Sequence, residues 1–420
     1  MAFEVSQKAK NLIGSEIIKL AGEINEKIKQ GKPIYNFTIG DFNPKIFPIP
    51  SQLKELILEN YRQDQTNYPP ADGVPELRDA VSSFIKHYGN LDYGKNEILI
   101  AGGARPLIYA IYQTLVDPGE KVIFPVPSWN NNHYTYLCNG EQMVVETKPE
   151  NNFMPTADEL RPHITDAVLV ALCSPLNPTG TVFTREQLEA ICDMILEENH
   201  RRGEGQKPLY LMYDQIYWLL TLGDTQHFDP VTLRPEMRNY TLFVDGISKG
   251  FAATGVRVGW SFGPEPIINK MKSILGHVGA WAPKAEQLAT AAYMKDFQAI
   301  NEYLGWIRRE VNERLQGFYV GFKQLRSEGY RVDAIVPKGA IYLTIQFDLK
   351  GQRTAEGKLL ETTDDVTSYI LNEAGFAIVP FYAFGSPRES SWYRLSIGTS
   401  RKEEIPEIIQ KLRDALDKLS

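Results

Sequence analysis

Three polar residues of the sequence stand just after short apolar runs, where buried strands are expected to end. Asp214 follows the run 208–213, Lys249 follows the run 240–245, and Arg257 lies eight residues beyond the lysine. Each has an ordinary explanation by itself, because a carboxylate can cap a helix, a lysine is usually a solvated surface group, and an arginine often belongs to a structural ion pair. Together they indicate chemistry, since a lysine near a buried carboxylate and an arginine can have a lowered pKa and form an imine with a carbonyl compound.

The segment 174–180, Ser-Pro-Leu-Asn-Pro-Thr-Gly, follows a third apolar run at 167–173. A surface turn rich in proline and glycine would explain it equally well. Ligands of open α/β sheets, however, bind at the edge where the carboxyl ends of parallel strands meet. We therefore expect this segment, Asp214 and Lys249 to face one site at that edge of a sheet.

The elements that must position these residues are short strands separated by helices. Continuous apolar runs occur at 97–101, 121–124, 167–173, 208–213, 240–245 and 256–262, and a helical pattern runs from about 105 to 115. Continuous rather than alternating apolar runs are typical of strands that are covered on both faces. The sequence therefore predicts an α/β fold with a mostly parallel sheet between helices.

The C-terminal third has a different pattern, which predicts a smaller α+β domain. A long helical pattern covers 297–328, alternating residues mark strands at 341–347 and 393–397, and a final helix at 405–419 repeats its apolar positions every 3.6 residues. We assign residues 1–50 to an N-terminal segment that is part of the small domain, 51–305 to a large domain, and 306–420 to the C-terminal small domain. The proline-rich stretch 44–50 is where the N-terminal segment would cross between them.

The composition excludes several classes of protein. The 420 residues are 43% hydrophobic and 23% charged, which is typical of a globular chain and not of a disordered one. A net charge of −7 argues against nucleic-acid binding. Cys138, Cys173 and Cys192 form no CxxC pattern, so neither a disulfide framework nor a metal site is expected. Without an apolar stretch of about 18 residues or a signal-peptide pattern, we expect no membrane association and a cytoplasmic location.

Several local motifs occur together in a fixed order. They lie at 67–69, 73–78, 103–105, 125–129, 174–180, 214–217, 248–257 and 393–396. In this order and spacing the chain resembles the class I and II aminotransferases, fold type I enzymes that use pyridoxal 5′-phosphate, from about residue 36 to residue 399. The part from 248 to 260 is most similar to the branch that includes bacterial aspartate aminotransferases. The resemblance implies a large cofactor-binding domain with a mostly parallel seven-stranded sheet between helices, plus a smaller α+β domain.

The resemblance gives catalytic roles to the residues at the predicted strand ends. Lys249 is similar to the lysine that holds the cofactor covalently and carries a proton during the reaction. Asp214 matches the carboxylate that pairs with the pyridinium nitrogen and so keeps the ring able to accept electrons. Asn177 and Tyr217 match the hydrogen-bond donors to the phenolic oxygen of the cofactor, whose anionic form they stabilise.

The resemblance also implies a phosphate site and a substrate site. The residues that match phosphate ligands are Gly103, Ala104, Arg105, Ser248 and Arg257, together with Tyr68, which in the family reaches the cofactor of the partner subunit in a homodimer. The residues that match the substrate site are Gly40, Trp129, Asn177 and Arg394. Of these, Trp129 would stack on the cofactor ring, and Arg394 would hold the α-carboxylate of the substrate by a two-pronged salt bridge.

Three positions depart from the pattern of the family. Gly246 stands where many relatives have a phosphate-contacting serine, and Arg105 stands where threonine, glutamine or lysine is common. Asn132, with His133 beside it, stands where some relatives have a histidine that supports the carboxylate. These departures remove no group that the reaction needs, but they leave phosphate binding open, because Arg105 could bind the phosphate or a distal carboxylate of the substrate.

The implied activity is the ping-pong transfer of the amino group of an L-amino acid to a 2-oxo acid, most often 2-oxoglutarate. The amino donor stays open, because Tyr342, Phe381 and Tyr382 are expected near the pocket and would suit apolar or aromatic donors. One alternative is a β-lyase of the same fold that acts on cysteine conjugates, since it would use the same lysine, aspartate and arginine.

Two other classes are disfavoured. A regulator that binds the cofactor without catalysis normally carries a DNA-binding domain ahead of this fold, whereas the motifs here begin near residue 36. A nicotinamide dehydrogenase would need a GxGxxG motif, which the Gly-Gly-Ala-Arg-Pro-Leu of 102–107 does not match.

Overall fold

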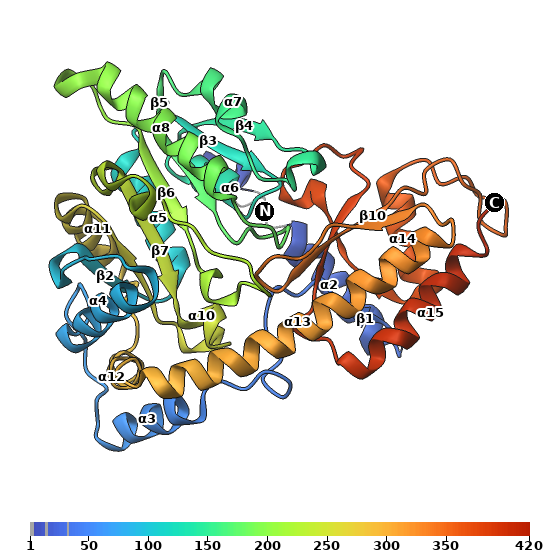
Figure 1. Ribbon diagram of the computed structural model, residues 1–420, viewed down its shortest axis with the longest axis horizontal. Helices are drawn as coiled ribbons and strands as arrows, with labels where there is room; N and C mark the ends of the chain where they lie inside the picture. Colours follow the sequence, from blue (N-terminus) through green and yellow to red (C-terminus); the bar gives the residue numbers. More distant parts are fainter. Residues whose placement is uncertain (1–3, 13–15, 32) are drawn as a thin grey trace.

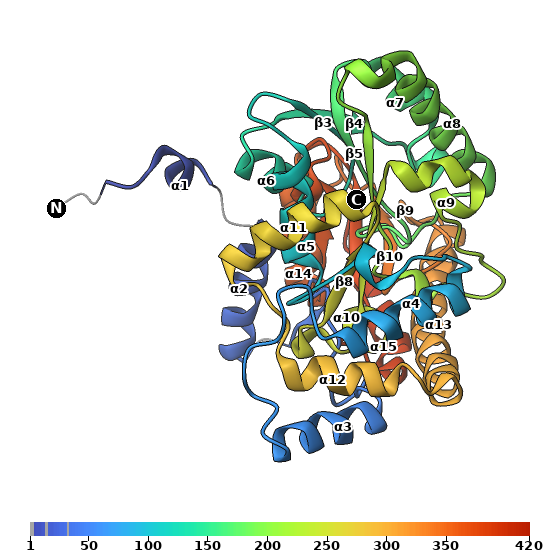
Figure 2. The same cartoon turned by 90° about the vertical axis from the view of Figure 1, so that its left-hand side faces the viewer.

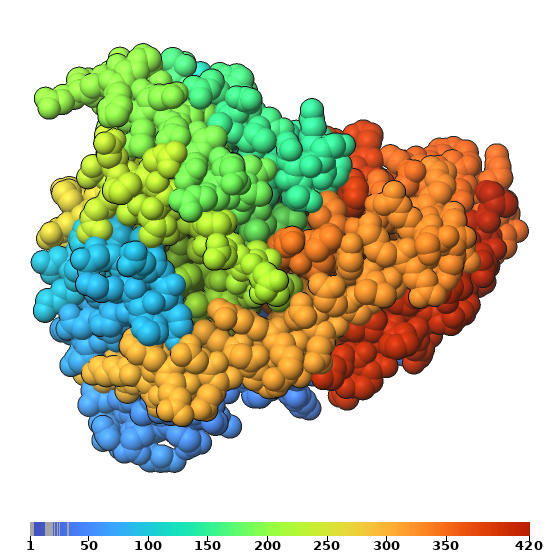
Figure 3. All heavy atoms as spheres, in the orientation of Figure 1, coloured from blue at the N-terminus to red at the C-terminus, as the bar shows by residue number. Residues whose placement is uncertain are grey.

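The computed structural model describes the chain except for residues 1–3, 13–15 and 32. It has a large part built on a seven-stranded sheet and a smaller part built on a four-stranded sheet, and the two are linked by one long helix (Figure 1). Figure 3 shows the two parts in broad contact, with the orange atoms of this helix passing from one part to the other. The predicted fold class is confirmed.

The large sheet confirms the predicted seven strands and their mostly parallel direction. Its order is β2 (Ile98–Ala101), β8 (Gly259–Phe262), β7 (Thr241–Gly246), β6 (Tyr210–Asp214), β5 (Ala167–Cys173), β3 (Lys121–Val126) and β4 (Glu141–Glu146). The five strands from β7 to β4 are parallel, whereas β8 is antiparallel to both of its neighbours. The carboxyl ends of β5, β6 and β7 therefore meet at one edge, as predicted for the polar residues that follow them.

Two details of the sheet differ from the predicted strands. The edge strand β4 was not predicted, because most of its side chains are exposed or half-buried and give no continuous apolar run. The run 256–262 begins its strand only at Gly259, because a 3-10 turn covers Thr254–Val256 and Arg257 has a left-handed backbone with φ of +63°.

Helices cover both faces of the large sheet, as continuous apolar strands require. On one face α5 (Ala104–Leu115) and α11 (Glu265–Val278) form one hydrophobic cluster with the strands. On the other face α4 (Pro75–Gly89) and α8 (Arg185–Arg202) contribute to a second, larger cluster. Figure 2 shows α3 (Ser51–Arg62) beside α12 (Lys284–Tyr293) at the lower end of this part.

The small part has an antiparallel sheet of order β12 (Val379–Pro380), β13 (Trp392–Ser396), β10 (Tyr342–Phe347) and β9 (Val332–Ala334). It is covered by α14 (Thr363–Ala374) and α15 (Ile405–Leu416), whose apolar faces are buried. The short strand β1 (Tyr35–Asn36) pairs in parallel with β11 (Phe376–Ala377), so this piece of the N-terminal segment joins the small part. The remaining helices are α1 (Gln7–Asn11), α2 (Glu16–Lys29), α6 (Asn131–Leu137), α7 (Ala157–Leu160), α9 (Pro230–Leu233) and α10 (Ile247–Gly250).

The linking helix α13 (Phe297–Ser327) is continuous for 31 residues. The predicted domain boundary at 305/306 falls inside it, and the predicted segment 1–50 includes the residues that the structure leaves undescribed. The domain boundaries therefore stay predictions.

Local signals in the sequence explain where several helices begin and end. Thr184 caps α8 and Thr362 caps α14, each by a side-chain oxygen that accepts from the third backbone N–H of the helix. Gly279 and Gly375 end α11 and α14 in the left-handed conformation, which glycine adopts without steric cost. Among the described residues, no helix is long and apolar enough to cross a membrane.

Candidate active site

A cavity of about 600 Å³ lies at the carboxyl edge of the large sheet, and residues of the small part such as Tyr342 and Arg394 complete its lining. Predicted site residues that line it are Gly40, Ala104, Arg105, Trp129, Asn177, Asp214, Tyr217, Ser248, Lys249, Arg257 and Arg394. Two predicted residues do not line it. Gly103 lies just behind the wall at the start of α5, and Tyr68 is 81% exposed with its ring against Trp281.

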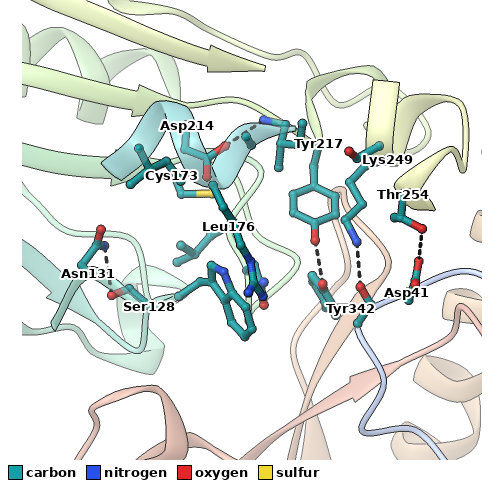
Figure 4. A pocket seen from close by; sticks show the side chains of 18 of the residues that line it. Asp41, Ser128, Asn131, Cys173, Leu176, Asp214, Tyr217, Lys249, Thr254 and Tyr342 are labelled. Carbon is teal, nitrogen blue, oxygen red and sulfur yellow. Dashed lines mark hydrogen bonds between the residues drawn. The ribbon is translucent and has the colours of Figure 1, made fainter. Parts of the chain in front are cut away.

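Lys249 lies on α10, the short helix that directly follows β7. Its Nζ donates to the backbone oxygen of Gly40 at 2.7 Å, from the N-terminal segment (Figure 4). Burial lowers the pKa of Lys249 to about 8, and the charges of nearby arginines act in the same direction, whereas the Asp41 carboxylate opposes them. A substantial fraction of this amine is therefore neutral near pH 8, which is the form that attacks a carbonyl group.

Asp214 is the last residue of β6. Its Oδ1 accepts from the backbone N–H of Ile216 at 3.0 Å. Burial raises the pKa of Asp214 to about 6, although the Ile216 N–H and the Lys249 charge both lower it. A carboxylate in this position favours a ligand that brings a positive charge to it.

The turn between β2 and α5 forms a site for an anion. Gly103, with φ of +90°, precedes the free N–H groups at the start of the 12-residue helix. Arg257 is fixed beside it, because its Nη2 donates to Gly102 O at 2.6 Å and its Nη1 donates to Thr254 O at 2.7 Å. A side chain at Gly103 would overlap the Arg257 guanidinium, so the glycine is what lets this cation approach the helix. A helix N-terminus with an adjacent arginine suits a phosphate group.

Arg394 enters the cavity from β13 and is 1% exposed. Its Nη2 donates to Thr38 O at 2.6 Å and its Nη1 donates to Asn177 Oδ1 at 3.2 Å, both of which are neutral acceptors. Within the described part of the chain its Nε has no hydrogen-bond partner. A buried guanidinium that is held only by neutral oxygens is suited to bind a carboxylate.

Aromatic groups form the other walls of the cavity. The guanidinium of Arg105 lies 5.2 Å from the ring centroid of Trp129. The hydroxyls of Tyr217 and Tyr342 are 2.6 Å apart, and the guanidinium of Arg394 lies 4.8 Å from the Tyr342 ring centroid. Of these contacts, the pair of Tyr217 and Tyr342 joins the large part of the molecule to the small part.

The structure also explains two of the positions that depart from the family pattern. A side chain at Gly246 would lie 2.9 Å from the Cα of Gly259, because β7 and β8 pair closely there. Asn131, and not Asn132, lines the cavity, where it accepts from the Tyr112 hydroxyl at 3.0 Å.

The aromatic residues expected near the pocket separate in the structure. Tyr342 lines the cavity. Phe381 instead belongs to a small hydrophobic cluster with Phe384, and the Tyr382 hydroxyl donates to Asp364 at 2.6 Å. Of the three residues, Tyr342 is therefore the one whose side chain lines the cavity.

Several lining residues were not predicted. Asp41 follows Gly40 and accepts from the Thr254 hydroxyl at 2.7 Å, and its position beside a predicted substrate residue was the signal that could have found it. Cys173 also lines the wall, at the end of β5. In the described ranges, no group of three or more His, Cys, Asp or Glu side chains is placed to hold a metal ion.

The residues present fit the cofactor that the resemblance implies. The anion site at the start of α5 suits a phosphate, the Asp214 carboxylate suits a protonated ring nitrogen, and the Lys249 amine suits an aldehyde. The hydroxyl of Tyr217 and the side chain of Asn177 add polar groups to the lining of the same cavity. The donor set therefore matches pyridoxal phosphate in its chemistry.

Comparison with known proteins agrees with this geometry. Residues 32–412 match the family model for aminotransferases of class I and II. The aspartate aminotransferase of Bacillus sp. (strain YM-2) is 29% identical over 401 residues, which cover 94% of this chain and 95% of that one. The crystal structure of the aspartate aminotransferase from Rhizobium meliloti is similar with a TM-score of 0.88 at 26% identity and covers 100% of both chains. The aspartate aminotransferase from Thermus thermophilus with maleate is similar with a TM-score of 0.86 at 25% identity, covering 99% of this chain and 100% of that one.

Proposed function

Since the chain belongs to the class I and II aminotransferases, we propose that its amino donor is an acidic L-amino acid, with aspartate preferred, and that 2-oxoglutarate is the acceptor. The family membership itself makes the chain a pyridoxal-phosphate-dependent aminotransferase. The relatives reported above are named aspartate aminotransferases, and one of them was solved with maleate, a dicarboxylate. These names support the choice of substrate.

The observation that carries the proposal is the meeting of Lys249, Asp214 and Arg394 in one cavity. Pyridoxal phosphate, when bound, supplies an aldehyde that takes up the amino group and a ring that withdraws electrons from the substrate. Asp214 would hold a proton on the ring nitrogen of that group. The phosphate would be held by Arg257, Ser248 and the N–H groups of Ala104 and Arg105.

Lys249 has two roles in this proposal. Its amine would hold the cofactor before the substrate arrives, and it would afterwards accept the proton from the Cα of the substrate and deliver it to the cofactor carbon on the other side of the amino nitrogen. A pKa of about 8 suits both roles, because the amine can be neutral to accept the proton and still acidic enough to return it.

Substrate recognition would use two arginines. Arg394 would bind the α-carboxylate in a bidentate manner, replacing its bonds to Thr38 and Asn177. Arg105 is exposed at the start of α5 beside the Trp129 ring, from where it would bind the side-chain carboxylate of the donor.

The substrate proposal is tested by a panel of amino donors with 2-oxoglutarate, in which the glutamate formed is measured. Aspartate should give the highest kcat/KM of the panel. The Arg105→Gln variant should lower the kcat/KM for aspartate about tenfold to a hundredfold and should change the kcat/KM for alanine much less. An equal loss for both donors, together with weaker cofactor binding, would instead assign Arg105 to the phosphate. Release of pyruvate and a thiol from cystathionine, faster than glutamate forms from any donor, would favour the β-lyase.

We also retain the prediction of a homodimer in which Tyr68 completes the partner's site. Its exposed position on the single chain is compatible with a contact to a second copy. Tyr68→Ala and Lys249→Ala chains would each be impaired alone, whereas mixed dimers would contain one intact site and recover activity. Absence of recovery, with mixing confirmed by mass, would place Tyr68 outside the partner's site.

A further inference from the structure

The hydroxyl pair of Tyr217 and Tyr342 joins the two parts of the molecule inside the cavity. Tyr217 follows β6 of the large sheet, Tyr342 begins β10 of the small sheet, and their hydroxyl oxygens are 2.6 Å apart (Figure 4). Both residues are buried, at 3% and 1% exposure. A hydrogen bond that is this short and shielded from water fixes the orientation of both hydroxyl groups.

The direction of this bond decides what Tyr217 can do for a ligand. A phenol has one proton to donate. If Tyr217 donated to Tyr342, its proton would be used and it could only accept from a bound molecule. If Tyr342 donates to Tyr217, the Tyr217 proton is free to face the cavity.

Two neighbours of Tyr342, the Arg394 guanidinium and the Gly40 backbone, favour donation from Tyr342 to Tyr217. The Arg394 guanidinium lies 4.8 Å from its ring centroid, and this positive charge makes the phenol a stronger donor. Burial raises the pKa of both tyrosines, and the Arg394 charge, which lies against the Tyr342 ring, opposes this rise. Of two phenols that share a hydrogen bond, the more acidic one is the better donor.

Gly40 limits where the Tyr342 hydroxyl can move. A side chain at Gly40 would lie 2.8 Å from this oxygen and 3.4 Å from Arg394 Nη1. The backbone of the N-terminal segment therefore packs closely against the Tyr342 hydroxyl. The Tyr342 hydroxyl therefore has little room beside Gly40, and the Tyr217 oxygen is a near acceptor for its proton.

We infer that Tyr342 is a positioning residue, whose hydroxyl donates to Tyr217 and thereby turns the Tyr217 proton toward the cavity. The inference rests on the proposed function, in which Tyr217 donates to the phenolic oxygen of the bound cofactor. Donation to that oxygen stabilises its negative charge and makes the nitrogen shared with Lys249 less basic. Loss of the Tyr342 hydroxyl should therefore raise the pH midpoint of the visible absorbance of the holoenzyme.

The test uses Tyr342→Phe, which keeps the ring against Arg394 and removes only the hydroxyl. We expect the pH midpoint of the holoenzyme absorbance to rise by about half a pH unit and kcat to fall about threefold to tenfold. The matched control is Tyr393→Phe, since Tyr393 is a buried tyrosine of the neighbouring strand β13 whose hydroxyl makes long contacts of 3.4 Å to Thr367 and Thr363. It should leave the midpoint unchanged and kcat within about twofold.

A double variant shows whether Tyr342 acts through Tyr217. Tyr217→Phe alone should raise the midpoint more than Tyr342→Phe, and the double variant should equal Tyr217→Phe alone. An unchanged midpoint in Tyr342→Phe, or effects on the midpoint that add in the double variant, would overturn the inference while leaving the proposed function intact. A wild-type protein that showed no pH-dependent visible band with pyridoxal phosphate would overturn the proposed function itself.

Discussion

The two halves of the cavity are built in different ways. In the half formed by the large sheet, Asn177, Asp214 and Lys249 lie at or just after the ends of adjacent strands, and the strand pairing that aligns Cys173 with Asp214 and Asp214 with Val244 sets their spacing. In the other half, the groups come from β10, β13 and the segment 38–41, which are far apart in the sequence. These are joined to the first half by single hydrogen bonds, such as those of Lys249 to Gly40 and Arg394 to Asn177.

This difference in construction indicates which half controls which property. The positions in the sheet half are part of a continuous core, so they should persist whether or not a ligand is present. The two bonds of Arg394, to Thr38 and Asn177, end on carbonyl and amide oxygens that a substrate carboxylate can replace. Changes in the sheet half should therefore remove the chemistry, and changes in the other half should alter binding and selectivity.

The largest effect is expected for Lys249→Ala, in the sheet half. Removal of the group that carries the proton should lower kcat by about three to four decades. The variant should still bind pyridoxal phosphate without the absorbance band of the covalent form, because the phosphate and ring contacts remain. Borohydride treatment of the wild-type holoenzyme, followed by peptide mass analysis, should find the cofactor fixed to the peptide with Lys249. Fixation to another lysine would remove this residue from the centre of the site.

The second-largest loss of activity is expected for Asp214→Ala. Loss of one partner of a buried ion pair costs about 3–5 kcal/mol, and about 1.4 kcal/mol is a factor of ten in rate. Proton transfer should therefore slow by about two to four decades, as measured by single-turnover loss of the visible band. The exposed Asp224 gives a control, since Asp224→Ala should leave the rate unchanged. A loss below tenfold in Asp214→Ala would mean that the ring nitrogen does not depend on this carboxylate.

Arg394→Ala tests the half that binds substrate. The kcat/KM for aspartate should fall by about two to three decades, because a buried charge-assisted contact to the α-carboxylate is lost. β-Alanine, which is aspartate without its α-carboxylate, should be turned over slowly by the wild type and should lose little more in the variant. If both compounds lost activity equally, Arg394 would be acting on the fold or the cofactor and not as the carboxylate clamp.

The same contrast explains what the sequence could predict. Asn177, Asp214 and Lys249 could be placed at one edge, because parallel strands bring their carboxyl ends together and short motifs mark those ends. Tyr342 contacts Tyr217 from 125 residues away, and no local pattern specifies such a pair. Strand β4 was not predicted because its mostly exposed side chains give no continuous apolar run. The strand predicted at 256–262 is shorter in the structure because the chain turns at Arg257. Tyr68 could be placed from the resemblance alone, since its proposed partner is another subunit.

The smallest effect is expected at Asp41, which lies between the two halves and bonds to Thr254. Burial lowers the pKa of Lys249 to about 8 from an ordinary value of 10.5, and the Asp41 charge raises it. Only the neutral amine attacks the aldehyde of the cofactor. Uptake of pyridoxal phosphate by the cofactor-free protein should therefore speed up about tenfold per pH unit below pH 8 and level off above it.

Asp41→Asn should move this profile in a defined direction. The amide oxygen can still accept from Thr254, but the negative charge that favours the protonated amine is gone. The Lys249 pKa should fall, so the levelling point should move to lower pH and uptake at pH 7 should become a few-fold faster, because a pKa lower by about 0.5 leaves about three times as much neutral amine. Stopped-flow absorbance between about pH 6 and 9.5 measures this, with Asp224→Asn as the exposed control. An unchanged pH profile of uptake, or slower uptake at pH 7, would show that Asp41 holds the segment 38–41 in position without affecting the charge of Lys249.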